Sequence, residues 1–538
     1  MRHPSLVIRH SSFLPAPPPP SRHAFASKPG SLDPRSVHSA PPLALNVPSP
    51  TIPGPHGASP ELEISRLDEP RRIATTQRKA NLAQSFRLCT AEGLVAMPIV
   101  IMTLPVNVVL AALFTKALHL PNQTIGLISS LPFACNFLQV GITPVLARWF
   151  PAKTICLVGT SIHAFSWMLF CLLLGFLPEN DPAAAGLWIG TWFFFSSLCG
   201  SITGVSWNAW IQEWVPSRLR GKYFGRRNRL LQFSTLTFTL LAGWALATWE
   251  YSRFGFQLVI AFGVALRMLS ILWQLRMPTE ASAKPPAQGA SLSAQFITLR
   301  RCQPFLHFIA FGALWSFAAN CFGPFYHVFM FEELGLSALQ VGTLSVCGAT
   351  GAALSMPAWG ALLDRYGNKS VMVVSLLLWQ AQNFAWCFMT PDTSDWLYPM
   401  WIWGGATNAG FFLGQFTLLL KLLPVPARNL ALGMNLAVTS LFAAIAPILG
   451  GAVLEFFLAR HSALPVYHAC FLVQPLLAIP VAWLLLRIRE PAARPLTHVV
   501  GAMSNVRTLA SLSGVSFLAQ YVFYRKARPS RPEPSDSA

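Results

Sequence analysis

The stretch GALLDRYGNK, Gly360 to Lys369, decides the fold because it joins a long apolar run to a short charged segment. Gly360 would permit close approach of two helices, and Gly367 would permit a tight turn. The charges expected at a membrane surface are supplied by Asp364, Arg365 and Lys369. We therefore expect a membrane-spanning helix to end here and an aqueous loop to begin.

Apolar runs of about twenty residues or more, the length that crosses a hydrocarbon core, surround this stretch on both sides. The 538-residue chain is 53% hydrophobic and only 11% charged, with a mean hydropathy of +0.47, whereas soluble domains carry about a quarter charged residues. The sequence predicts an all-α membrane protein with about twelve transmembrane helices, at 88–118, 122–147, 154–177, 187–212, 229–249, 256–275, 304–331, 338–363, 370–390, 397–421, 430–456 and 466–487.

Lys and Arg residues concentrate in alternate loops, which orients the chain. One side receives Arg148 and Lys153, the basic run from Arg218 to Arg229, and the pair Arg365 and Lys369. The positive-inside rule places that side in the cytoplasm, together with both termini. The net charge of +19 therefore orients a multi-pass protein of the inner (plasma) membrane and does not indicate nucleic-acid binding.

GALLDRYGNK resembles the G-x-L-x-D-R-x-G-x-K/R signature of the major facilitator superfamily. About 216 residues upstream, PVLARWFPAK, Pro144 to Lys153, is a degraded counterpart in which Arg148 stands where Asp is expected. The segments Val215–Arg218 and Val425–Arg428 repeat at a similar offset of about 210 residues. The resemblance implies two pseudo-symmetric six-helix bundles, a central cavity and alternating access.

A further segment, RGKYFGRRNR from Arg220 to Arg229, resembles a bacterial branch of this superfamily whose substrates are mostly unassigned. In that branch a W-x-x-W pair precedes the run, and here Trp207 and Trp210 supply it. We expect the chain to begin with a disordered N-terminal tail (1–84) and an N-terminal six-helix bundle (85–275). A cytoplasmic linker (276–303), a C-terminal six-helix bundle (304–487) and a cytoplasmic tail (488–538) should follow.

The two ends of the chain carry separate expectations. The Pro-rich and Ser-rich segment 1–84 has no run long enough to span a membrane, and a translation start assigned too far upstream would also explain it. In the C-terminal tail, a weakly amphipathic stretch at 499–524 would suit a helix that lies in the membrane interface.

The substrate cavity of the superfamily is lined mainly by helices one, four, seven and ten, so polar residues near their midpoints are the candidates. These are Asn107, Ser201, Asn320, Asn408 and Gln415. Amides and hydroxyls without a fixed charge predict a small neutral or polar organic solute. At each position the alternative role is a hydrogen bond between helices.

Charged residues near the helix ends are candidates for gating and coupling. Asp364 could pair with Lys421, and a charge-reversed pair of Arg148 and Glu213 could close the cytoplasmic side of the first half. The alternative is a set of solvated surface ions of little consequence. Glu92, early in the first helix, is the candidate if transport is coupled to protons.

The sequence favours a secondary active or facilitative transporter of a small organic solute. One alternative is a proton-coupled exporter of amphiphilic compounds, and another is a non-transporting membrane sensor or scaffold. The chain has no P-loop, no H-E-x-x-H pair and no G-x-S-x-G elbow, so we expect neither an enzyme nor a bound cofactor. The expected partners are a small-molecule substrate, the lipid bilayer and, if transport is coupled, an ion, with no nucleic acid, and the resemblance implies a monomer.

Overall fold

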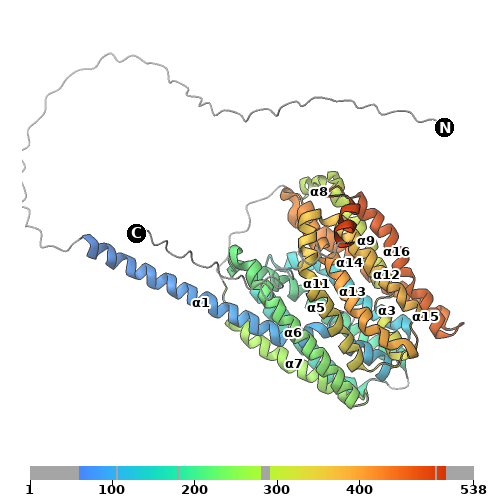
Figure 1. The fold of residues 1–538 in the computed structure, drawn as a ribbon. Coiled ribbons are helices and arrows are strands. Elements are labelled where there is room, and N and C mark those ends of the chain that lie inside the picture. Colours follow the sequence, from blue (N-terminus) through green and yellow to red (C-terminus); the bar gives the residue numbers. More distant parts are fainter. Residues whose placement is uncertain (1–59, 105–106, 179–180, 280–290, 491–492, 505–538) are drawn as a thin grey trace, which may run out of the picture. The chain divides into compact units, whose positions relative to one another are not determined.

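The computed structural model describes residues 60–104, 107–178, 181–279, 291–490 and 493–504, and every regular element in these ranges is a helix (Figure 1). Residues Met1–Arg72 and Ile73–Ala538 form two separate units. Of the first unit the structure describes only the start of α1. The remaining description concerns the second unit, in which the "first half" is 80–279 and the "second half" is 291–490.

The first half contains seven α-helices. They are α1 Pro60–Met102, α2 Val108–Ala112, α3 Asn122–Leu146, α4 Ala152–Leu173, α5 Pro182–Trp214, α6 Ser217–Thr248 and α7 Arg253–Arg276. A π-helical turn, Leu113–Ala117, extends α2. The first predicted helix is therefore divided into α1 and α2, which begins after Asn107.

The second half repeats this order after a short additional helix, α8 Leu292–Arg301. Its membrane helices are α9 Gln303–Cys321, α10 Phe325–Glu332, α11 Ala338–Tyr366, α12 Asn368–Asn383, α13 Leu397–Leu422, α14 Arg428–Leu458, α15 Ala463–Phe471 and α16 Val473–Arg487. A final helix, α17 Leu496–Ser504, follows. The division between α9 and α10 repeats the one between α1 and α2.

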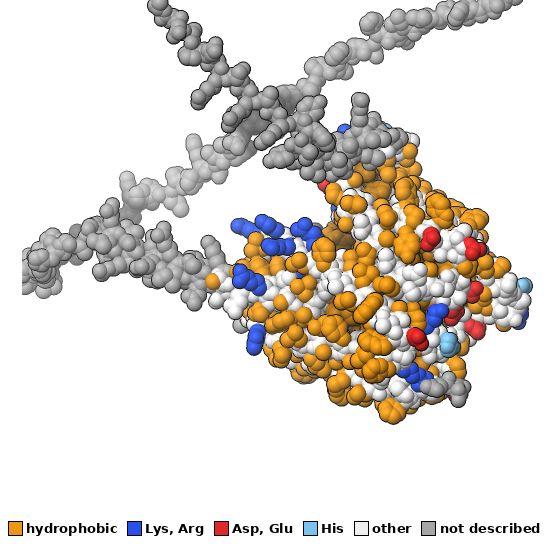
Figure 2. Space-filling model, turned by 60° about the horizontal axis from the view of Figure 1, so that its bottom comes forward, with side chains coloured by type: hydrophobic (Ala, Val, Ile, Leu, Met, Phe, Trp, Pro, Cys, Tyr) orange, Lys and Arg blue, Asp and Glu red, His pale blue; other side chains and the backbone are white. Residues whose placement is uncertain are grey.

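Eleven of the described helical segments are long and apolar enough to cross a membrane. The 26-residue α13 has the length of a twelfth span and lies at the predicted position of the tenth helix. Its hydropathy is lower because Gly, Trp and amide residues interrupt the apolar ones. Over much of one face the surface is hydrophobic, with most of its Lys and Arg gathered on one side (Figure 2). The predicted all-α membrane fold is confirmed.

Three boundaries differ from those predicted. Residues 60–84, expected to be disordered, belong to α1, and 292–301, expected to be linker, form α8. The basic run from Arg218 to Arg229, predicted to lie in a loop, belongs to the start of α6, and its side chains are used in packing. Arg220 donates to the carbonyl oxygens of Val215 and Gln212 at the end of α5, at 3.0 and 2.6 Å. The expected interfacial helix at 499–524 lies mostly outside the described residues.

The largest cluster of buried apolar side chains contains residues of both halves. It joins Phe114, Ile189 and Phe256 of the first half to Phe329 and Phe471 of the second. These residues lie at the end opposite Asp364. At the Asp364 end, one cluster is formed only by first-half residues, and three are formed by second-half residues together with Leu496, Val499 and Ala502 of α17. Buried apolar contacts between the halves thus concentrate at the opposite end, although α3 and α14 stay in contact toward the Asp364 end, where a Cβ on Gly433 would lie 3.8 Å from Val140.

Two hydrogen bonds join the halves at the shared end, each to the first residue of a helix. The backbone N–H of Asn122 donates to Glu455 Oε2 at 2.9 Å, and the N–H of Ala338 donates to the Tyr251 hydroxyl at 2.9 Å. Asn122 begins α3 and Ala338 begins α11, which hold equivalent positions in the two halves. The first turn of a helix has no internal acceptor for these donors, so each half completes a helix of the other. We call these two bonds the latch.

Glycines set the closest helix crossings, as is common where lipid supplies no hydrophobic driving force. A Cβ atom on Gly405 of α13 would collide with the backbone of Gly348 on α11. The same holds for Gly450 of α14 against the Cys321 carbonyl of α9. The motif residue Gly360 was predicted to allow such an approach, but a Cβ there would meet no atom within 4 Å. That prediction is wrong.

Candidate functional site

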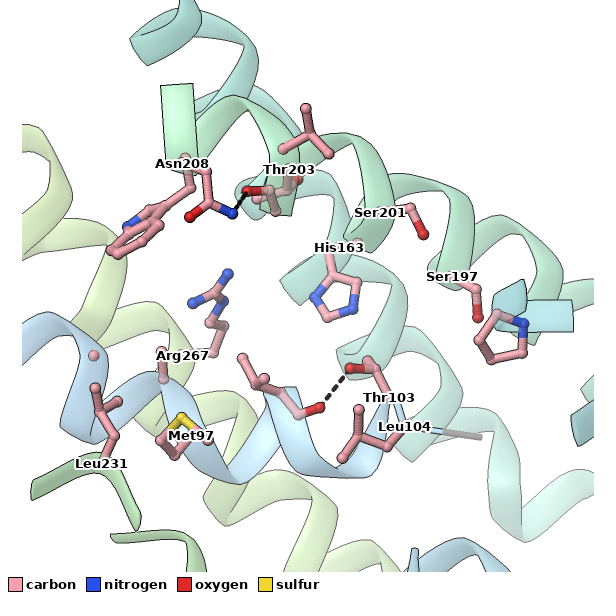
Figure 3. A pocket seen from close by; sticks show the side chains of 18 of the residues that line it. Met97, Thr103, Leu104, His163, Ser197, Ser201, Thr203, Asn208, Leu231 and Arg267 are labelled. Carbon is pink, nitrogen blue, oxygen red and sulfur yellow. Dashed lines mark hydrogen bonds between the residues drawn. The ribbon is translucent and has the colours of Figure 1, made fainter. Parts of the chain in front are cut away.

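A cavity of about 820 Å³ lies in the first half, on the side that faces the second. Its wall is formed by α1 and α3 to α7, and Leu436 of α14 completes it. Along α1 it extends from Glu92 to Thr103, a distance of about 16 Å at 1.5 Å per residue. Figure 3 shows polar side chains from α4, α5 and α7 facing apolar ones from α1 and α6 across this space.

Glu92 is the only carboxylate in the wall of this cavity, and it is 2% exposed. Its Oε1 atom accepts hydrogen bonds from Gln274 Nε2 at 2.8 Å and from Ser270 Oγ at 3.3 Å. Two guanidinium groups lie beside it: Arg267 Nη1 is 3.8 Å from Oε1, and Arg227 Nη2 is 3.4 Å from Oε2. The carboxylate thus connects α1 to both α6 and α7 inside the bundle.

Arg227 is held on all sides. Its Nε donates to the Cys89 carbonyl at 3.2 Å, and its guanidinium lies over the Trp207 ring, 4.6 Å from the centroid. Gly93 lies one turn of α1 after Cys89 and leaves room for the Arg227 side chain, because a Cβ at Gly93 would collide with the guanidinium. Cation–π stacking and hydrogen bonds to the ionised form stabilise a buried charge. Arg227 is therefore a fixed cation that braces α6 against α1.

His163 of α4 faces the cavity near Arg267 (Figure 3). Its Nε2 accepts a hydrogen bond from Trp167 Nε1 at 3.2 Å. An acceptor Nε2 in a neutral imidazole means that the proton is on Nδ1. His163 therefore offers a neutral donor.

Two of the predicted site residues line this cavity, Ser201 and Glu92. Asn107 does not, because its side chain caps α2: Oδ1 accepts from the Leu110 N–H at 2.8 Å, and Nδ2 donates to the Leu104 and Met102 carbonyls. Asn320 donates to the Ser316 carbonyl of its own helix at 2.7 Å. Asn408 and Gln415 are half-buried in α13, away from the cavity wall.

Arg227, Arg267, Gln274 and His163 were not predicted as site residues. A signal for Arg267 was present, since it interrupts the apolar run of the sixth predicted helix. Arg227 was assigned to a loop among other basic residues. Extending the helical period of α6 back to Ser217 would have placed Arg227 on the buried face.

The signature stretch has a different partner from the one expected. Lys421 Nζ lies 3.2 Å from Glu490 Oε1, not beside Asp364, which is exposed. The Glu490 carboxylate also accepts the backbone N–H groups of Asn368 and Lys369 at 3.0 and 2.8 Å. Gly367 has a φ of +88°, a conformation that favours glycine, as the tight turn requires. The carboxylate of Glu490 thus caps α12 and fixes this turn.

The corresponding first-half residues form no salt bridge among the described side chains. Arg148, just after α3, and Glu213, in the last turn of α5, are both exposed. Lys153, the last residue of the degraded motif, instead donates to the Met277 carbonyl at 2.7 Å. The charge-reversed pair is not present in this conformation, and its closing role stays a proposal.

Comparison with known proteins agrees with this fold. The profile of the Major Facilitator Superfamily matches residues 306–525. Multidrug resistance protein 1 of Bacillus subtilis (strain 168) is 30% identical over 164 residues, which are 30% of this chain and only 40% of the relative. The chain is thus aligned to less than half the length of that curated relative.

Solved transporters share the fold at low identity. A variant of the nucleoside transporter NupG superposes with a TM-score of 0.59 at 17% identity, covering 76% of this chain and 100% of that one. The D-xylose–proton symporter gives 0.59 at 15% identity, with 76% and 98% covered. An inward-facing bacterial homologue of the lysosomal transporter Spinster gives 0.53 at 15%, with 84% and 99% covered. The family profile and the GALLDRYGNK signature thus place residues 306–525 in the major facilitator superfamily, and the whole helical domain has the fold of solved transporters.

Proposed function

We propose that this protein is a secondary active or facilitative transporter that moves a small organic solute across the membrane by alternating access. The observation that carries the proposal is a cavity of about 820 Å³ on the side of the first half that faces the second, together with a core in which the buried contacts shared by the halves concentrate at one end. Rocking of two halves about such a shared end is the motion that alternating access requires. With the Asp364 end in the cytoplasm, as the charges predict, this conformation is inward-facing.

The substrate would bind in the first-half cavity. Ser201 and the other hydroxyl side chains of α5 form one wall, and Glu92 with Arg227 and Arg267 forms another. In the outward-facing state the two halves would come together at the Asp364 end. Four exposed residues are available to contact the facing half there: Arg148, Glu213, Asp364 and Arg365. Lys421, Lys369 and Gly367 would keep the turn before α12 rigid during this motion.

Alternating access predicts that one cavity position can be reached from both sides of the membrane in turn. A Ser201→Cys variant in oriented vesicles should react with a membrane-impermeant maleimide from the Asp364 side, and more slowly from the opposite side. Ser462→Cys, on the exposed opposite end, controls for sidedness, and the wild-type protein controls for its ten native cysteines. Labelling from one side only, under every condition, would favour a sensor or scaffold.

Weakening the latch should shift the population toward the outward-facing state. Tyr251→Phe removes the acceptor of the Ala338 N–H, and Glu455→Leu removes that of Asn122. A hydrogen bond contributes about 1 kcal/mol net, so each loss should change the ratio of states about fivefold. The expected readout is faster Ser201→Cys labelling from the opposite side, largest in the double variant. Unchanged labelling would mean that the latch does not hold the halves together.

A proton-coupled exporter of amphiphilic compounds is the second candidate. Apolar residues such as Met97, Val100 and Phe133 line much of the cavity, and the partly aligned relative is a multidrug resistance protein. Transport in proteoliposomes that depends on a pH gradient, and loses that dependence in Glu92→Gln, would favour this candidate over facilitated movement.

A further inference from the structure

We propose that the first-half cavity binds an organic anion, through a carboxylate or phosphate group held by Arg267. The inference rests on the proposed transport function and narrows its substrate class. It replaces the neutral solute predicted from sequence, because the structure places fixed charges in the cavity wall.

The charges of the cavity do not balance. Glu92 is the one acidic residue in the wall, whereas Arg227 and Arg267 are both cationic, so these three side chains sum to +1. They are 2, 8 and 6% exposed. A cation inside the membrane is costly unless an anion compensates it. Among the described residues, one positive charge in this cavity wall is therefore not balanced by an anion.

Arg267 is the arginine left with free donors. Arg227 is engaged by Cys89, Glu92 and the Trp207 ring. Arg267 uses only Nη1, which donates to Ser270 Oγ at 3.3 Å and lies 3.8 Å from Glu92. Its Nε has no hydrogen-bond partner. The Nε and Nη2 groups form the planar edge with which a guanidinium holds a carboxylate or phosphate through two parallel bonds.

Neutral donors line the same cavity as Arg267. His163 faces the same space as Arg267 (Figure 3) and offers Nδ1–H, and the buried hydroxyls of Ser197 and Thr203 in the cavity wall have no partners. The apolar side chains of Met97 and Leu231 could contact the carbon skeleton of the ligand. A volume of about 820 Å³ is ample for an organic anion, since small-molecule sites span about 300–1,000 Å³.

Matched pairs of compounds test this inference in the purified full chain. The thermal midpoint is measured with succinate and succinamide, phenylacetate and phenylacetamide, and glycerol 3-phosphate and glycerol. Binding to the folded state raises the midpoint. We expect an anion to raise it where its neutral partner does not, and the carboxylate and phosphate pairs separate the two chemistries. Arg267→Gln should weaken the apparent affinity about tenfold or more. Arg276→Gln, exposed on the same helix, should leave it unchanged.

The ligand-free protein gives a second readout. If Arg267 carries the unpaired charge, Arg267→Gln should melt at or above the wild-type temperature without ligand, whereas Arg227→Gln should melt lower. An equal loss of stability in both variants would make Arg267 a structural counter-ion and overturn the inference. So would equal shifts from the neutral partners, or no anion-specific shift in any pair. These failures differ from failure of the transport proposal, which would leave Ser201→Cys accessible from one side only.

Discussion

Replacing Gly405 with alanine should cost this protein most of its folded population. The added Cβ would lie 2.6 Å from the carbonyl carbon of Gly348 and 2.8 Å from its Cα. Both are backbone atoms of α11, so no side-chain rotation can relieve the collision, and the α11–α13 crossing must open. Overpacking a core costs about 1–3 kcal/mol where side chains can shift, and more is expected here. The measurement is the monodisperse fraction and thermal midpoint in detergent.

Gly360→Ala is the matched control, because a Cβ at Gly360 would meet nothing within 4 Å. Alanine is favoured over glycine in a helix by about 1 kcal/mol, so this variant should be as stable as wild type or slightly more stable. The signature glycine would thus matter less for folding than one outside the motif. Wild-type stability in Gly405→Ala would show that α11 and α13 lie further apart than described.

Glu92→Leu should be the most damaging charge substitution in the chain. It would leave Arg227 and Arg267 buried without a counter-ion, and it would remove the acceptor of Gln274 and Ser270. Breaking a buried ion pair on one side costs about 3–5 kcal/mol. We expect a large drop in the thermal midpoint or failure to fold. Glu213→Leu, which changes an exposed carboxylate of α5, should change stability little.

The double variant Glu92→Leu with Arg227→Leu separates charge from packing. Replacing a buried pair with apolar side chains is often neutral or stabilising, so the part of the lost stability that is due to Arg227 should return, while Arg267 stays without a counter-ion. If the double variant melts no higher than Glu92→Leu alone, the loss comes from the packing of α1 and not from an unpaired cation.

Glu92 shows how much of the site the sequence could reveal. Its position in the first apolar helix marked it as a functional candidate, because a carboxylate there is costly. Its partners were not predictable, since Arg227 and Gln274 lie 135 and 182 residues away. Contacts at such separations depend on how three helices are rotated toward one another. Asn107 shows the opposite case: its place near the middle of the first predicted helix suggested a binding role, but its hydrogen bonds are all local and cap α2.

By itself, the sequence determined that the chain is a polytopic membrane protein of two related halves, with a charge asymmetry that orients it. Those properties depend on the length, period and charge of local segments, which the hydrocarbon core constrains strongly. Tertiary structure alone decided which glycines bring helices together, which arginine keeps a guanidinium nitrogen without a hydrogen-bond partner, and at which end the halves share most of their buried core. These depend on the relative rotation and separation of helices, which packing across the whole bundle sets and no local pattern encodes.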